Sequence, residues 1–220
     1  MTHSFGIEFE PAITSFVTVA LVPVDRFTRR EVRAGVSVEL WDTDKNRALP
    51  YQLIRNRSGY FILSDQPREG LYTFRINAAA AGYSGPIDFI ANPAADGLRQ
   101  IVWLDRSPSF SFDPETTLVR GTVVIPGEDP ASSAGLDGAT VSIEGERFQT
   151  SSDARGSFAL AMEPPAPAAG EPAQAFERQV SIAHPDHETR VLTVTLEAGR
   201  THIFSEPIAI DGSDESSFTE

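Results

Sequence analysis

The sequence contains no cysteine, and Lys45 is the only lysine among its 18 basic residues. Without cysteine the chain can form neither disulfide bonds nor thiolate metal sites. It also lacks any apolar run near the roughly 18 residues that a membrane-spanning helix needs. The longest run, Phe16 to Val24, follows no basic segment and precedes no small-residue cleavage site, so it indicates a strand and not a signal peptide. We therefore expect no membrane insertion, and a cytoplasmic location or a place in a particle assembled in the cytoplasm.

A basic surface is missing too, because the formal net charge is −13. Residues 1–112 contain 12 basic and 12 acidic residues, whereas residues 113–220 contain 6 basic and 19 acidic ones. An acidic surface repels phosphate backbones, and no basic stripe interleaved with aromatic residues offsets that repulsion. We expect no nucleic acid partner. The acidic half keeps the chain soluble or steers it towards a basic partner.

The sequence patterns of common catalytic sites are absent as well. There is no glycine-rich phosphate loop, no Gly-x-Ser-x-Gly elbow and no cysteine nucleophile. The sequence therefore contains no candidate set of residues for nucleophilic catalysis. We expect a protein that is not an enzyme and that carries no cofactor.

One short pattern places two imidazoles and a carboxylate within four residues, in His184-Pro185-Asp186-His187. The proline indicates a loop, where the two rings do not converge as they would one turn apart on a helix. No third and fourth ligand is evident in the sequence. We expect a surface loop there, with metal binding as the less favoured alternative.

A second short pattern, Asp42, Asp44 and Asn46, alternates as in a calcium loop. The EF-hand pattern requires Gly at the next position and Glu six residues beyond it, but Arg47 and Leu53 stand there. The stretch therefore predicts a hairpin turn and no metal site.

What the sequence does contain is a series of short alternating strands between turn residues, with 16 glycines and 16 prolines. A polar turn closes on Gly156 and leads into the strand Ser157 to Leu160; about a hundred residues earlier, Gly59 leads into Tyr60 to Leu63 in the same way. Turn signals every 8–12 residues are typical of a β-sandwich. We therefore expect an all-β chain with a tandem repeat.

The repeat predicts two sandwiches. The first takes residues 1–112 and the second residues 113–210, with an acidic tail over 211–220. The run Val119 to Pro126 corresponds to Thr18 to Pro23, and each run closes on an aliphatic residue followed by proline. A segment rich in proline and alanine, Pro164 to Ala175, has no counterpart in the first half, so we expect it to be an exposed loop.

Several motifs of the second half carry a family likeness. They are Gly-Thr-Val-Val at 121–124, Gly-Ala-Thr-Val-Ser-Ile at 138–143 and Thr-Ser-Ser-Asp-Ala-Arg-Gly-Ser-Phe at 150–158. Together they resemble the carboxypeptidase regulatory-like domain, a transthyretin-like (prealbumin-like, immunoglobulin-like) seven-stranded sandwich. The first half resembles a more diverged copy. The likeness implies a fold and an accessory, adhesive or assembly role, and the C-terminus lacks the Tyr-Arg-Gly-Ser motif of the hydroxyisourate hydrolases that share this fold.

The leading functional hypothesis is a non-catalytic interaction or structural subunit, as an accessory component of a larger assembly such as a phage-tail-like or surface structure. Its candidate contact is the N-terminal arm (residues 1–11), in which Phe5, Ile7 and Phe9 share one face of a period-2 strand. The arm completes an edge of its own sandwich, or it adds a strand to a protein partner or to a second copy in a homo-oligomer.

The alternative hypothesis is a carbohydrate- or small-ligand-binding module. Its candidate residues are four aromatic side chains that would stack on sugar rings, namely Trp41, Tyr51, Tyr60 and Tyr83. The competing explanation is that most of them pack within the sandwich. The two hypotheses differ in whether at least three of the four rings lie on one exposed face.

Overall fold

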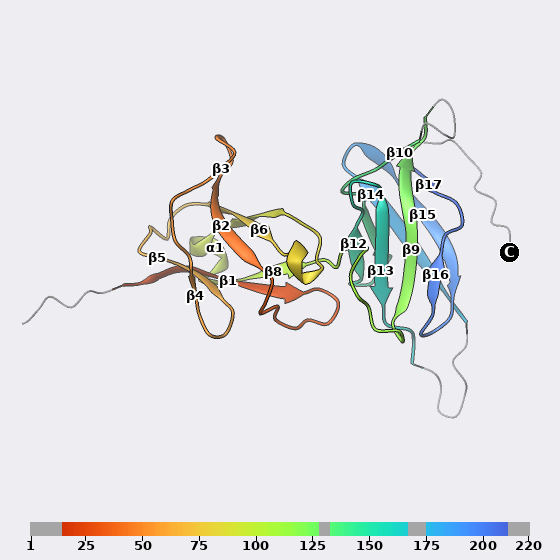
Figure 1. The fold of residues 1–220 in the computed structure, drawn as a ribbon, viewed down its shortest axis with the longest axis horizontal. Helices are drawn as coiled ribbons and strands as arrows, with labels where there is room; N and C mark the ends of the chain where they lie inside the picture. The colour runs from red at the N-terminus through yellow and green to blue at the C-terminus, as the bar shows by residue number, and fades with distance from the viewer. Residues whose placement is uncertain (1–14, 128–132, 167–174, 211–220) are drawn as a thin grey trace, which may run out of the picture.

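The chain folds into two β-sandwiches that follow each other along the long axis of the molecule (Figure 1). The computed structural model describes residues 15–127, 133–166 and 175–210. Over these residues strands account for almost all regular structure, and the helices are a single 3-10 turn, η1 (Ala79–Ala81), and one short α-helix, α1 (Pro93–Asp96). The all-β expectation is confirmed.

The first sandwich consists of two four-stranded sheets, with strand orders β4-β5-β1-β8 and β3-β2-β6-β7. Helix α1 connects β7 to β8 and so leads the chain from one sheet to the other. The strands are β1 (Val17–Asp25), β2 (Ser37–Asp42), β3 (Arg47–Ala48), β4 (Ile54–Arg55), β5 (Phe61–Ser64), β6 (Tyr72–Asn77), β7 (Ile87–Ala91) and β8 (Arg99–Leu104).

The second sandwich also has two sheets. One has the order β10-β9-β13, with β16 and β17 also paired to β9, and the other has the order β12-β11-β14-β15. The strands are β9 (Thr117–Ile125), β10 (Ala134–Gly135), β11 (Thr140–Ile143), β12 (Gln149–Ser151), β13 (Ser157–Met162), β14 (Phe176–His184), β15 (His187–Leu196), β16 (Thr201–Ile203) and β17 (Ile208–Ala209). The described residues thus form more strands than the seven expected for each sandwich, because several of these strands are only two residues long.

The strand pairing repeats from one sandwich to the next. Strand β1 pairs with β5 antiparallel and with β8 parallel, and β9 pairs with β13 antiparallel and with β16 and β17 parallel. In the facing sheets, the pairings of β2-β6-β7 and of β11-β14-β15 are all antiparallel. The repeat seen in the sequence is therefore a repeat of topology.

Each sandwich has its own hydrophobic core. Strand alternation builds it: along β6, Phe74 and Ile76 point inwards and are almost fully buried, while Arg75 between them points outwards. In the second sandwich Val180 and Ile182 of β14 occupy the equivalent place. Each such side chain stabilises the fold by about 1.5–3 kcal/mol when fully buried.

Glycines at the two repeated turns have the backbone conformation that the sequence predicts. Gly59 has φ +87° and Gly156 has φ +76°, in the region that side chains with a Cβ avoid. At Gly156 a Cβ would also lie 2.0 Å from the carbonyl oxygen of Val123 on β9. The turn thus brings β13 so close to β9 that only glycine fits.

Between Tyr51 and Arg55 only Ile54 and Arg55 form a strand, which pairs with β5. Three predicted segments lie wholly or mostly outside the described residues. They are the N-terminal arm, the loop between β13 and β14, and the acidic tail over 211–220. None of the helices within the described ranges is long and apolar enough to cross a membrane.

Candidate functional site

The two sandwiches meet at Arg106, the second residue after the end of β8. Its guanidinium carbon lies 4.8 Å from the ring centroid of Phe27, 4.4 Å from that of Phe110 and 5.4 Å from that of Phe112. Its Nε donates a hydrogen bond of 2.8 Å to Oδ2 of Asp25, at the end of β1. We call these five residues the arginine junction. A guanidinium suits this place because it is planar, stacks on aromatic faces and stays charged.

Asp25 is the buried anion of the junction. Besides Arg106 it accepts hydrogen bonds from the backbone N–H of Thr28 (2.7 Å) and from the hydroxyl of Tyr83 (2.9 Å). Burial raises the pKa of this carboxyl, but the bonds from Thr28, Arg106 and Tyr83 together outweigh burial and lower the pKa below its ordinary value. Asp25 is therefore ionised and paired at neutral pH, which makes it part of a structural network.

The second sandwich packs against the same junction. The hydroxyl of Thr150 donates to the carbonyl oxygen of Arg106 (3.1 Å), and Nη1 of Arg120 donates to that of Pro108 (2.7 Å). The rings of Phe27 and Phe148, one from each sandwich, lie 6.0 Å apart. The connection between the sandwiches is thus held by side chains from both sides.

Strand β8 forms an edge of the first sandwich. It is the last strand of its sheet, so within the described residues no strand pairs with its outer edge. Its buried side chains alternate with exposed ones, and the exposed side chains include Ile101 (37% exposed) and Trp103 (38% exposed). An unpaired edge strand that exposes apolar side chains is open to pairing with another chain.

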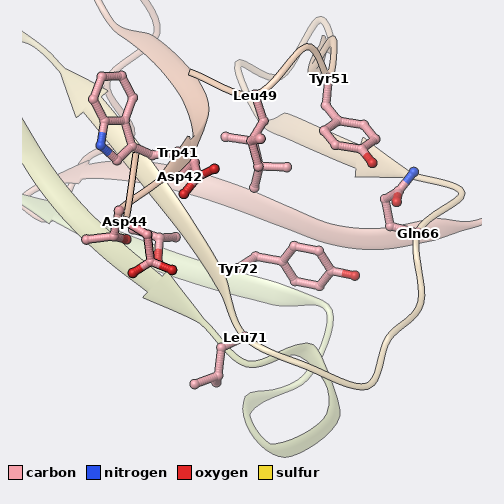
Figure 2. Close-up of a pocket in the computed structure, with 11 residues that line it drawn as sticks. Trp41, Asp42, Asp44, Leu49, Tyr51, Gln66, Leu71 and Tyr72 are labelled. Carbon is pink, nitrogen blue, oxygen red and sulfur yellow. The ribbon is translucent and has the colours of Figure 1, made fainter. Parts of the chain in front are cut away.

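A pocket of about 370 Å³ lies in the first sandwich, between the loop that follows β2 and the segment that leads into β6 (Figure 2). Its walls carry three aromatic rings, two carboxylates and several uncharged polar groups. The residues that line the pocket include Trp41, Asp42, Asp44, Tyr51, Gln66, Leu71 and Tyr72.

The structure brings together two of the four aromatic residues that the sequence nominated, so the expected exposed face with at least three of these rings does not form. Trp41 and Tyr51 line the pocket. Tyr60 lies on the other sheet, where its hydroxyl donates to Glu31 and Arg99 stacks on its ring. Tyr83 is buried, with 8% of its surface exposed, because its hydroxyl bonds to Asp25 in the core. The pocket also includes Tyr72, the half-buried first residue of β6, which the sequence did not nominate.

The two metal-like patterns form local structure. His184 and His187 pair across the hairpin between β14 and β15, with ring centroids 5.0 Å apart. Asp42 accepts the backbone N–H of Lys45 at 3.1 Å, which closes the expected turn. In the part of the chain that the structure describes, no group of three His, Asp or Glu side chains could hold a metal ion.

No protein-family model matches the chain, and no curated protein matches it. Among solved structures it is similar to the shaft pilin spaA from Lactobacillus rhamnosus GG, with 12% identity and a TM-score of 0.27, over 90% of this chain and 98% of that one. A point mutant of the same pilin gives a TM-score of 0.24 at 12% identity and the same coverage. The fold stated above rests on the strand pairing of this chain and not on these similarities.

Proposed function

We propose that this protein is a non-catalytic structural subunit that joins a larger protein assembly, such as a phage-tail-like or surface structure. The observation that carries the proposal is the unpaired edge of β8, with Ile101 and Trp103 exposed along it. Soluble proteins usually protect such edges with charges, prolines or a covering segment. Here the edge is a surface on which a further strand can add.

The arginine junction supports the same role. Hinge motion between two domains is the default when few contacts cross between them. In this chain Thr150 and Arg120 bond the connecting segment, and the rings of Phe27 and Phe148 meet across the boundary. Bending there would break these contacts. In an assembly, a subunit whose two halves keep a fixed orientation can hold the neighbours on its two sides at a fixed distance and angle.

The N-terminal arm is the strand that we assign to such an edge. Phe5, Ile7 and Phe9 alternate with Gly6 and Glu8, as the residues of an added strand would. Each apolar side chain contributes about 1.5–3 kcal/mol if it becomes fully buried. We assign the arm of one copy, or of a related subunit, to the β8 edge of the next.

Deleting residues 1–10 tests this assignment. The deletion should leave the thermal unfolding of the isolated chain almost unchanged and should abolish self-association in sedimentation velocity, or binding of the partner in co-purification. Ile101→Lys should have the same effect, because an edge lysine blocks strand addition. The matched control is Ile90→Lys on β7, the edge strand of the facing sheet, where Ile90 is 61% exposed.

The control is expected to associate as the unmodified chain does. A deletion that lowers thermal stability at every protein concentration would place the arm in its own sandwich. An arm that is dispensable both for stability and for every association would contradict the assembly role.

A further inference from the structure

We propose that the pocket between Trp41, Tyr51 and Tyr72 binds a neutral carbohydrate. This site is separate from the β8 edge and does not depend on the assembly role. The pocket volume of about 370 Å³ lies in the range of small-ligand sites, and a single sugar ring with part of a second would occupy it. Its form is a hollow between loops, which suits a chain of sugars that enters from one side.

The aromatic side chains supply faces for stacking. Tyr51 is 45% exposed and lies on a loop, and Figure 2 shows its ring and that of Tyr72 on the border of the same hollow, with Leu49 beside Tyr51 and Leu71 below Tyr72. Trp41 forms another wall. One face of its ring is occupied, because the guanidinium carbon of Arg75 lies 3.7 Å from the ring centroid. Tyr51 therefore offers the main platform for the apolar face of a sugar.

The polar groups of the pocket include both donors and acceptors that are free to bind. Among the described residues the hydroxyl of Tyr51, the side-chain amide of Gln66 and the carboxylate of Asp44 have no hydrogen-bond partner. Amide and hydroxyl groups donate and accept, whereas the carboxylate only accepts. Sugar hydroxyls also donate and accept, so they match this mixed set better than an ion of either sign does.

The charges around the pocket oppose both kinds of ion. The backbone bond from Lys45 and the charge of its ammonium group lower the pKa of Asp42 below its ordinary value, so two carboxylates face the hollow and repel an anion. A cation would find Asp42 already paired with Lys45, whose Nζ lies 3.5 Å from Oδ2. A neutral polyhydroxylated ligand avoids the repulsion and does not compete with Lys45 for Asp42.

The chain provides its own reporter, because it has only two tryptophans and the other one, Trp103, lies on β8. In the full-length variant Trp103→Phe, all tryptophan fluorescence comes from Trp41. We would titrate this variant with soluble oligosaccharides of glucose (α- and β-linked), xylose and N-acetylglucosamine. At least one of them should change the fluorescence with saturation, with a Kd on the order of 1 mM or below.

Site variants locate the binding. In the Trp103→Phe background, Tyr51→Ala and Gln66→Ala should each weaken binding about tenfold or more. Tyr60→Ala, which removes the ring from the other sheet, is the matched control and should leave binding within about twofold. Amide resonances of residues 40–44 and 66–73 should shift on addition of the same sugar.

Two results would overturn the proposal. One is a panel in which no oligosaccharide changes either the fluorescence of Trp41 or those amide resonances at about ten times the expected Kd. The other is a sugar that binds equally well to Tyr51→Ala and to Gln66→Ala. If either result occurs while the arm deletion still abolishes association, the assembly role stands without a ligand site.

Discussion

Gly156 and Gly145 share nearly the same left-handed backbone, with φ +76° and +73°, but their surroundings differ. At Gly145 a Cβ would meet nothing within 4 Å, whereas at Gly156 it would lie 2.0 Å from the carbonyl oxygen of Val123 and 3.0 Å from the backbone nitrogen of Leu136. Gly145→Ala should cost about 1–2 kcal/mol from backbone strain alone. Gly156→Ala should cost several times as much, because β9 or the β10 segment must move.

Urea unfolding of the two variants measures this difference. Gly145→Ala serves as the matched control, since it carries the same strain without the clash. Equal losses of stability would show that the turn can open away from β9 at little cost. The comparison separates the stability cost of a left-handed backbone at a residue with a Cβ from the cost of its steric clash with β9.

At this scale the sequence predicts some features well and others not at all. The left-handed glycines follow from local pattern, because a polar turn before an alternating strand needs them. The pairing of Arg106 with Asp25 does not, because 81 residues separate the partners and no local pattern relates them. The same holds for the pocket: Trp41 and Tyr51 could be nominated as surface aromatics, but only the folded loops bring Tyr72 and Gln66 beside them.

At the scale of strands, β1 and β9 occupy the same central position in the two sandwiches. Strand β1 lies between β5 and β8, and β9 lies between β13 and the pair β16 and β17. Most residues of β1 are buried. Apolar, β-branched runs predicted both strands, whereas the edge strands β3, β4 and β10, with two residues each, are too short to show a periodicity in the sequence.

The central strands should hold the slowest-exchanging amides of the chain. Their N–H groups are bonded within the sheets and lie over the cores, so exchange there requires unfolding of the whole sandwich. Amides of the edge strands β4 and β7 should exchange through local opening, at rates about a hundredfold faster or more. Native-state hydrogen exchange followed by NMR measures both. Equal protection of β1 and β4 would contradict this ranking.

At the scale of the molecule, each sandwich should fold without the other. The core of the second sandwich is built from its own residues, and among the described residues Phe27 is the one contributor from the first half, packed at the margin of this core. A fragment of residues 113–220 should therefore unfold cooperatively, with a free energy of roughly 5 kcal/mol or more. Circular dichroism during urea titration tests this, and a fragment without a cooperative transition would contradict the expected boundary after residue 112.

The parallel pairing of the first and last strands has a mechanical consequence. In the first sandwich the chain enters at the start of β1 and leaves at the end of β8, and these neighbours run in the same direction from the Ala20 and Arg99 pair to the Asp25 and Leu104 pair (Figure 1). Tension applied at the two points would slide one strand along the other. All the hydrogen bonds between them then carry the load at once, instead of opening one after another as in a hairpin that is peeled apart. Strands β9 and β17 repeat this arrangement, so each sandwich is built to resist being pulled open lengthwise.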